Sequence, residues 1–317
     1  MIIYHHSDFD GAVSAAIFCD FIKNYQGYEE DIRFVPVNYP SMDVIHKPGD
    51  VFTVLDFQYL DGATWFFDHH KTSFRDESHK ERMDNKQLFW DPESKSNVGL
   101  IYRSLCEVYH YERDLIDLVK WSDIIDSAGY ESVEQALDYS IPALKIHAAL
   151  FYADTANNFT VSDFIKYLLE YDFDLEKISE IPIVRFLAKE AEVKIDRDSS
   201  AYSKNLDVHE HGKVITWDTS TYFRNPNRFI PFLLEKNSYY SIGIRKSSSG
   251  YEIAYGKNPW CKKKSIVNTG KVLKDLFGGG GHFDVAGASF KDYNSARQAQ
   301  LQLIEITVNA IKEQTGN

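Results

Sequence analysis

Two short stretches rich in imidazoles and carboxylates stand out near the start of the chain. It opens with MIIYHHSDFDG, and WFFDHHKT follows within the first quarter. In both stretches the polar groups come directly after apolar or aromatic residues, where a strand would be buried. Because an unpaired buried charge is costly, such groups need a partner at that place. A pair of divalent metal ions would be a suitable partner.

The first cluster combines His6, Asp8 and Asp10. In an extended segment residues i, i+2 and i+4 point to one face, so these side chains could converge on one point. Gly11 would then let the chain turn tightly into a helix. Imidazole and carboxylate ligands without thiolates suit manganese, magnesium or iron better than structural zinc. The alternative is a plain strand end whose aspartate caps the following helix.

The second cluster is Asp68-His69-His70. Adjacent imidazoles of an extended segment point to opposite faces, so one can bind metal while the other faces a substrate. Between the two clusters, Asp56 ends the apolar run VFTVL. An acid in that position is also typical of an ordinary turn. Taken jointly, the clusters favour a metal site.

Hydrophobic patterning supplies the elements that must position these groups. A helical spacing of apolar residues covers 12–23. The strand candidates are residues 2–4, 32–37, 51–55 and 64–67. Strands that alternate with helices predict an α/β fold with a parallel sheet, in which ligands bind beyond the carboxyl ends of the strands. Each of the three acidic positions falls where a strand ends.

In the remaining two thirds of the chain the residue pattern changes once, from helical to strand-like. Residues 97–187 have a mostly helical pattern, and the polar stretch 189–205 predicts a long solvated helix. Strand patterns follow at 214–217, 239–244 and 251–254, then a helix near 269–276 and a last helix from 295. A chain of 317 residues holds about two domains. We therefore expect a catalytic domain at 1–188, a linker helix at 189–205 and a smaller C-terminal α/β domain at 206–317.

Composition narrows the class of protein. Hydrophobic residues make up 44% and charged residues 26%, as in ordinary soluble proteins. The formal charge of −12 disfavours a long nucleic-acid track, which needs a basic footprint. No apolar run reaches the roughly 18 residues of a spanning helix, and the three cysteines form no close pair. We expect a cytoplasmic protein without a membrane partner.

Four motifs in this order, HHSDFDG, LDFQ, FDHHKT and GGGGHFDVAGAS, resemble those of the DHH phosphoesterases with their associated C-terminal domain. The resemblance spans nearly the whole chain. That group includes RecJ-like exonucleases, nano-RNases with nucleotide-phosphatase activity, and cyclic-dinucleotide phosphodiesterases. The resemblance implies an N-terminal parallel-sheet domain, a C-terminal substrate-binding domain and an active site in the cleft between them.

The resemblance also implies a dinuclear site, usually of manganese, with magnesium as the alternative. The implied metal ligands are His6, Asp8, Asp10, Asp56, His69 and Asp123. Asp56 would bridge the two ions and act with His70, which the match places beside the substrate phosphate. Asp123 is the ligand with the most alternatives, because Asp126 and Asp117 lie close to it in the sequence.

The implied substrate-binding residues lie in the C-terminal part. Gly279, Gly280 and Gly281 could wrap an anion with their backbone N–H groups, and His282 adds a donor; a flexible linker is the alternative. Where the family usually has small residues after this histidine, the chain has FDV. Arg245, in SIGIRKS, matches a family arginine and could clamp phosphate in a bidentate manner. An exposed strand arginine is the alternative there.

These features predict a hydrolase for short oligonucleotides or small nucleotides, since neither length nor charge provides a track for a polymer. A RecJ-like single-strand exonuclease, a cyclic-dinucleotide phosphodiesterase and a catalytically idle nucleotide sensor remain open. A pyrophosphatase shares the N-terminal motifs, but those relatives carry a different C-terminal domain. A homodimer is open as well.

Overall fold

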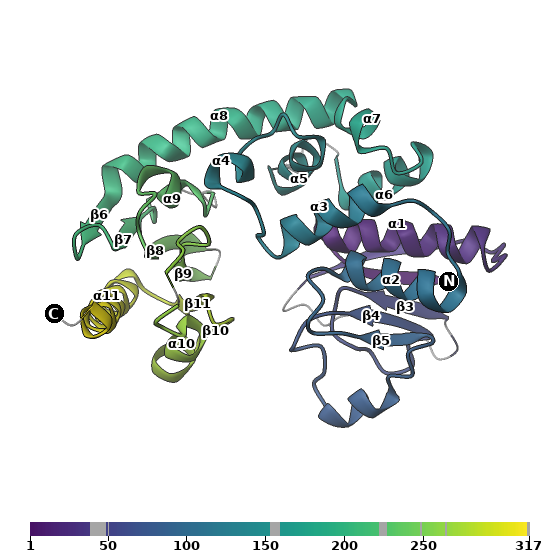
Figure 1. Cartoon of the computed structure of the whole chain (residues 1–317), viewed down its shortest axis with the longest axis horizontal. Helices are drawn as coiled ribbons and strands as arrows, with labels where there is room; N and C mark the ends of the chain where they lie inside the picture. Colours follow the sequence, from purple (N-terminus) through teal and green to yellow (C-terminus); the bar gives the residue numbers. More distant parts are fainter. Residues whose placement is uncertain are drawn as a thin grey trace. The chain divides into compact units, whose positions relative to one another are not determined.

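The computed structural model describes residues 1–38, 49, 51–152, 159–221, 227–247, 249–263 and 265–315 (Figure 1). The chain divides into two compact units. Unit 1 comprises Met1–Tyr130 and Asp138–Ala191, and unit 2 comprises Glu131–Leu137 and Glu192–Asn317. Unit 2 therefore includes a short segment from within the region 97–187, which the helical pattern of that region did not indicate.

Unit 1 is built on a five-stranded sheet. Its strands are β1 (Ile2–His6), β2 (Arg33–Val37), β3 (Phe52–Leu55), β4 (Trp65–Asp68) and β5 (Leu88–Trp90). All pairs are parallel, in the order β2-β1-β3-β4-β5. The α/β class with an N-terminal parallel sheet is thus confirmed. From β1 the chain first adds β2 on one side and then β3, β4 and β5 on the other, so the strand order reverses between β1 and β3. Open α/β sheets bind ligands at such a point.

Both faces of this sheet are covered, which explains why its strands read as apolar runs. Helix α1 (Phe9–Asn24) covers one face, where the ring of Phe18 lies 5.5 Å from that of Trp65 and 6.2 Å from that of Phe67. Figure 1 shows α2 (Asn97–Tyr109) beside α1. The other face packs against loop residues. This second cluster contains Tyr4, Phe52, Val54, Phe57, Tyr59, Phe66 and Phe74.

The rest of unit 1 is mostly helical, as predicted for residues 97–187, whereas the short helix at 77–82 was not predicted. Its helices are η1 (Glu77–Arg82), α3 (Ile116–Asp126), α5 (Pro142–Tyr152), α6 (Val161–Glu170) and α7 (Leu175–Ser179). Helix α8 (Pro182–Asn205) begins in unit 1 and ends in unit 2, so the expected linker 189–205 is the later part of a longer helix. Pro182 starts it, because proline has no N–H and fits a first helical turn.

Unit 2 contains a six-stranded mixed sheet in the order β10-β11-β9-β8-β7-β6. The strands are β6 (Leu206–His209), β7 (Val214–Asp218), β8 (Tyr240–Ser247), β9 (Gly250–Lys257), β10 (Gly280–Gly281) and β11 (Val285–Phe290). Only the β7–β8 pair is parallel. The helices are α4 (Val133–Ala136), α9 (Ile230–Leu234), α10 (Thr269–Phe277) and α11 (Tyr293–Thr315).

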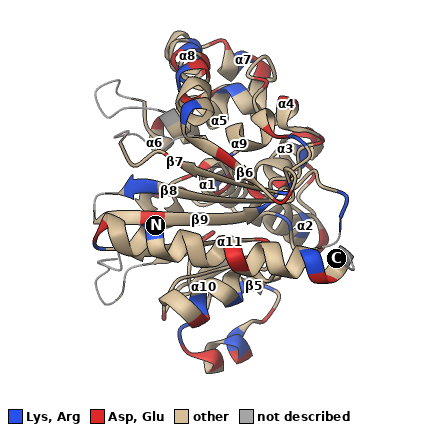
Figure 2. Cartoon of the chain, turned by 90° about the vertical axis from the view of Figure 1, so that its left-hand side faces the viewer, with Lys and Arg blue, Asp and Glu red and all other residues tan. Residues whose placement is uncertain are grey.

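Helix α11 lies along the sheet of unit 2 (Figure 2), and its inner face fills the core of that unit. Ala296, Ala299, Leu303 and Ile311 of α11 pack with Ile242 and Tyr255 and other buried residues of the strands. The expected C-terminal α/β domain is confirmed in its class. None of the helices in the described part of the chain is both long and apolar enough to span a bilayer.

Candidate metal centre

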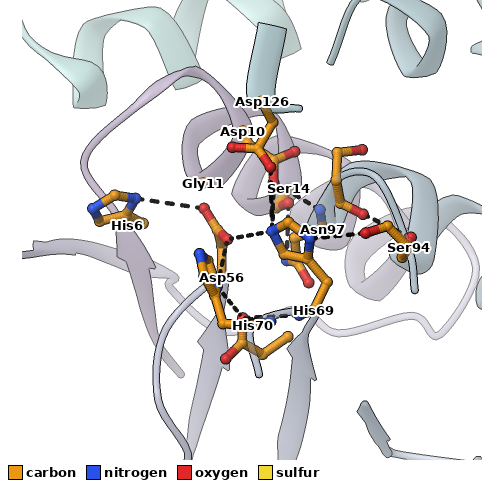
Figure 3. Close-up of polar contacts among 12 residues, drawn as sticks. His6, Asp10, Gly11, Ser14, Asp56, His69, His70, Ser94, Asn97 and Asp126 are labelled. Carbon is orange, nitrogen blue, oxygen red and sulfur yellow. Dashed lines mark hydrogen bonds and ion pairs between the residues drawn. The ribbon is translucent and has the colours of Figure 1, made fainter. Parts of the chain in front are cut away.

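The three polar clusters of the first 70 residues meet at one edge of the unit 1 sheet (Figure 3). β1 ends at His6, Asp56 follows β3, and His69 follows β4. The register pairs His5 with Leu55 and Leu55 with Phe67, so the three strand ends are level. In Figure 3, Asp56 lies between His6 and His69.

Asp56 is the central residue of the cluster. Its side chain is 1% exposed, and among the described residues neither carboxylate oxygen has a hydrogen-bond partner. Its backbone has φ 56°, in the left-handed region, and its N–H donates to the carbonyl of Phe67 over 2.9 Å. Such a conformation costs on the order of 1–3 kcal/mol in a residue other than glycine and is typical of functional sites. The structure thus holds a buried carboxylate that has histidine rings within 4 Å but, among the described residues, no hydrogen bond to either oxygen.

Imidazole nitrogens surround this carboxylate at distances longer than good hydrogen bonds. The Nδ1 atom of His6 lies 3.6 Å from Oδ2, and the Nε2 atom of His69 lies 3.5 Å from Oδ1. The Nε2 atom of His69 is also buried and has no hydrogen-bond partner in the described part of the chain. Buried donors and acceptors that face each other without bonding fit a cation between them.

One group of candidate ligands is His6, Asp8 and Asp56, whose ligand atoms all lie within 4.8 Å of one another. The Oδ2 atom of Asp8 lies 2.8 Å from Nδ1 of His6, while its Oδ1 atom accepts the N–H of Gly11 over 2.9 Å. Asp8 therefore caps α1 and faces the cluster at the same time. A Cβ on Gly11 would lie 2.3 Å from the carbonyl oxygen of His6, so glycine is required there for close approach.

A second group is Asp10, His69 and Asp126. Nε2 of His69 lies 3.4 Å from Oδ2 of Asp126 and 3.9 Å from Oδ2 of Asp10. Nδ1 of His69 lies 3.1 Å from the carbonyl oxygen of Ser94, to which it can donate. That bond assigns the proton to Nδ1 and leaves Nε2 as the atom able to bind a metal.

The expected ligand Asp123 belongs to none of the candidate ligand groups found among the described residues. Its Oδ1 atom accepts a hydrogen bond from the Oγ atom of Ser96 over 2.6 Å, next to the start of α2. Asp126, one turn further along α3, is the acid that the structure brings to His69. In this structure Asp123 binds the N-cap residue of α2, and its role as a metal ligand stays a prediction.

His70 is held by the buried carboxylate of Asp68. Its Nδ1 atom lies 2.8 Å from Oδ1 of Asp68. Asp68 is 0% exposed, and its Oδ2 atom accepts the hydroxyl of Ser73. Trp90 donates its Nε1–H to the carbonyl of His70 over 2.9 Å. Burial lowers the pKa of His70, but Asp68 and then Asp56 outweigh it, so the pKa is raised. The ring is therefore fixed and biased toward its charged form.

The electrostatics of the cluster reflect crowded carboxylates. Burial raises the pKa of Asp10 well above its usual range, and burial followed by the charge of Asp56 raises the pKa of Asp126 to about 7. Burial lowers the pKa of His6 and His69, but Asp56 and neighbouring acids outweigh it and raise these pKa values to about 11 and about 10. The pKa shifts therefore favour protons on the imidazoles and on Asp10 when no metal is bound, and cations can replace those protons.

The substrate residues expected in unit 2 lie on two different elements. Arg245 lies on β8, and its guanidinium binds Glu252 of β9 through Nε at 2.9 Å and Nη2 at 2.8 Å. His282 is exposed and follows β10. The role of both residues in binding phosphate stays a prediction.

The glycine run is a paired strand rather than a flexible linker, because Gly280 and Gly281 form β10 and pair with β11. A Cβ on Gly279 would lie 2.4 Å from the carbonyl oxygen of Gly287, and one on Gly281 would lie 2.5 Å from Cα of Ala286. The N–H of Gly279 donates to the carbonyl of Leu273 over 3.1 Å. Close backbone packing accounts for two of these glycines, whereas a Cβ on Gly280 would meet nothing within 4 Å.

No protein-family model matches the chain, and a search of curated proteins finds no relative. Solved structures do match. A pGpG-specific phosphodiesterase, PggH from Vibrio cholerae, has a TM-score of 0.68 at 19% identity, with 98% of this chain and 99% of that chain covered. An exopolyphosphatase-related protein from Bacteroides fragilis has a TM-score of 0.56 at 17% identity, with 98% and 93% covered. RecJ from Thermus thermophilus, in complex with Mg²⁺, has a TM-score of 0.52 at 13% identity, with 97% and 49% covered.

Proposed function

We propose that this chain, which has the fold of the DHH-family phosphoesterases, is a metal-dependent hydrolase of phosphoester bonds in short oligonucleotides or small nucleotides. The observation that carries the proposal is the carboxylate of Asp56. It is buried, it has no hydrogen-bond partner among the described residues, and it belongs to two candidate ligand groups, one with His6 and Asp8 and one with His69 and His70. A buried charge in that state calls for a cation.

The residues fit two divalent ions. His6, Asp8 and Asp56 would hold one, and the other would be held by Asp10, Asp56, His69 and Asp126. Carboxylate oxygens mixed with imidazole nitrogens suit Mn²⁺, with Mg²⁺ as the alternative. The Mg²⁺ in the RecJ structure supports a divalent ion in this fold.

Bound divalent ions would supply Lewis-acid chemistry, polarising a phosphoryl oxygen and lowering the pKa of a water molecule. The protein holds Asp56 in place through its backbone, so little reorganisation is needed at that ligand. Asp68 fixes the ring of His70, which can donate a hydrogen bond to a phosphoryl oxygen as negative charge develops. In unit 2, His282 would bind a further phosphate, and Arg245, oriented by Glu252, would assist.

Several features favour a short substrate. The net charge is −12, and Figure 2 shows acidic and basic residues mixed along α8 rather than a basic track. The match to the pGpG-specific phosphodiesterase covers nearly all of both chains, whereas about half of RecJ is matched. We assign the chain substrates of about two to five nucleotides, because Arg245, His282 and the neighbouring lysines can bind only a few phosphates.

The test is a length series of single-stranded RNA and DNA with manganese, compared by kcat/KM at fixed salt. A cyclic dinucleotide, 3′-phosphoadenosine 5′-phosphate and pyrophosphate complete the series. Dinucleotides should be hydrolysed best. Equal cleavage of a roughly 20-residue strand, several site sizes long, would favour a RecJ-like exonuclease instead. Binding of nucleotides without any hydrolysis would favour a sensor.

A further inference from the structure

The hairpin between β10 and β11 carries an exposed phenylalanine at its tip. The N–H of His282 donates to the carbonyl of Val285 over 2.8 Å, which closes a four-residue turn. Phe283 lies in this turn and is 52% exposed. It is not part of the core of unit 2, whereas Phe277 and Phe290 pack on one another with ring centroids 5.8 Å apart. In the described part of the chain no aromatic ring packs on Phe283.

The backbone of this tip is held at several points. The N–H of Thr269 donates to the carbonyl of Phe283 over 2.8 Å, and the N–H of Gly270 donates to the carbonyl of His282 over 3.0 Å. These are N–H groups of the first turn of α10, which have no partner inside their own helix. A Cβ on Gly270 would lie 2.6 Å from the same carbonyl oxygen of His282, so the helix and the tip are in close contact.

A fixed backbone that keeps a large apolar ring in water gives up the stabilisation that burial would provide. The turn could carry a small polar residue without that loss. The neighbour of Phe283 is His282, the proposed phosphate ligand. A nucleotide offers a phosphate and a flat aromatic base separated by one sugar, and stacking on an aromatic side chain works for every base.

We propose that Phe283 is a stacking platform for a nucleobase next to the phosphate bound by His282. The inference rests on the proposed function and deepens it. It means that the protein distinguishes base-bearing nucleotides from inorganic pyrophosphate and polyphosphate, and that it does so without selecting among bases.

The kinetic test compares Phe283→Ala, Phe283→Leu and Phe283→Trp. Leu301→Ala is the matched control, because Leu301 is also 52% exposed but lies on α11. The substrates are a linear dinucleotide and its analogue with hydrogen in place of both bases. The Ala and Leu variants should raise KM for the dinucleotide by about 5- to 100-fold, the range of base–aromatic stacking. Phe283→Trp and Leu301→Ala should stay within about threefold of wild type.

The base-free analogue should be hydrolysed equally by wild type and Phe283→Ala. A binding test without turnover uses metal-stripped protein and a dinucleotide that contains 2-aminopurine. Its fluorescence should be quenched by wild type and by Phe283→Trp, but much less by Phe283→Leu.

The outcomes separate the two claims. If the wild-type enzyme is active and KM is unchanged in Phe283→Ala and Phe283→Leu, the stacking role of Phe283 is overturned and the proposed function is not. Full function of Phe283→Leu overturns stacking in favour of simple apolar contact, and a raised KM in Leu301→Ala overturns the assignment to the tip. A wild-type protein that hydrolyses no nucleotide overturns the proposed function as well.

Discussion

The backbone N–H of Asn97 donates to the Oδ2 atom of Asp10 over 2.7 Å and thereby joins the first turn of α1 to the start of α2. The N–H of Val98 donates to the other oxygen over 3.0 Å. The N-terminus of a helix favours a negative charge, so α2 acts against the burial and the neighbouring charge of Asp56 that raise the pKa of Asp10. The position of Asp10 therefore depends on how the start of α2 is held.

That start is held by Ser96, whose Oγ atom accepts the N–H of Gly99 and donates to Asp123. We expect Asp126→Asn to lose one bound ion and most activity. Asp123→Asn should keep two ions per chain and lose about 1–3 kcal/mol of stability, because a hydrogen bond to a charged group is weakened. Elemental analysis and urea unfolding measure the two effects. Loss of metal in Asp123→Asn with retention in Asp126→Asn would reverse the assignment.

Asp56→Asn should abolish hydrolysis while the protein stays folded. Asparagine tolerates the left-handed backbone of position 56 as aspartate does, so the change removes the charge and little else. The measurements are kcat/KM at saturating manganese and a circular dichroism spectrum. Retention of more than about a tenth of the wild-type rate, roughly 1.4 kcal/mol in barrier, would remove Asp56 from the mechanism.

The metal-free protein should lose stability as pH rises. His6 and His69 have pKa values raised to about 11 and about 10, above the unfolded value of about 6.5. Their contribution to folding stability is therefore complete below about pH 6.5 and is lost as the pH rises from there through the two folded-state pKa values. The raised pKa of Asp126 acts in the same direction, since its ionisation disfavours the folded state above the usual carboxyl range.

Thermal melts in chelator from about pH 6 to about pH 9 test this sign. Mg²⁺ should raise Tm more at the upper end, because metal binding releases the imidazole protons. Asp56→Asn is the control and should show a flatter profile, since both histidines lose their main partner. A metal-free Tm that rises over this range would contradict the account of the cluster.

Gly11→Ala should lower both stability and metal content. Its Cβ would lie 2.3 Å from the carbonyl oxygen of His6, and the nearest atoms are all backbone atoms of that residue, so no flexible side chain can move aside. Gly256→Ala is the matched control, because a Cβ there would be in ordinary contact 3.5 Å from Val285. Tm and elemental analysis compare the two variants. Equal behaviour would show that close approach at Gly11 does not position His6.

His282→Ala should raise KM for nucleotides and leave metal content unchanged, because His282 is assigned to phosphate rather than to an ion. Its side chain is exposed at the hairpin tip, so the fold should be unaffected. Steady-state kinetics and elemental analysis of the same preparation provide the check. An ion lost from this variant would show that the residue is a metal ligand.

The meeting of the polar clusters at one end of the unit 1 sheet could be predicted from sequence because its signals are local. β1, β3 and β4 are apolar runs that stop at acidic residues, and a parallel sheet brings such ends together. β5 has three residues and β10 two, too short for a period to be detected. Asp126 faces His69 while Asp123 is bonded to Ser96, and no local sequence pattern reports that bond.

The glycine run shows another limit of sequence. Gly279 and Gly281 invite an interpretation as anion ligands, yet their lack of a Cβ is already required by the strand that packs against them. Sequence reports that a side chain is absent at these positions, but it does not report whether a ligand or a neighbouring strand needs the space. The pairing of β10 with β11 provides that information.

The division of the chain into two units has a consequence for the order in which they fold during synthesis. Glu131–Leu137 belongs to unit 2, although it precedes the last part of unit 1. Its ion pair from Glu134 to Lys236 joins residues made far apart in time during translation. On the ribosome this segment emerges before the rest of unit 2, so it cannot pack until Glu192–Asn317 has been made. Unit 1 can form as soon as Asp138–Ala191 has left the exit tunnel. We therefore expect a nascent intermediate with unit 1 complete and α4 still undocked, and a chain truncated after α8 would be arrested in that state.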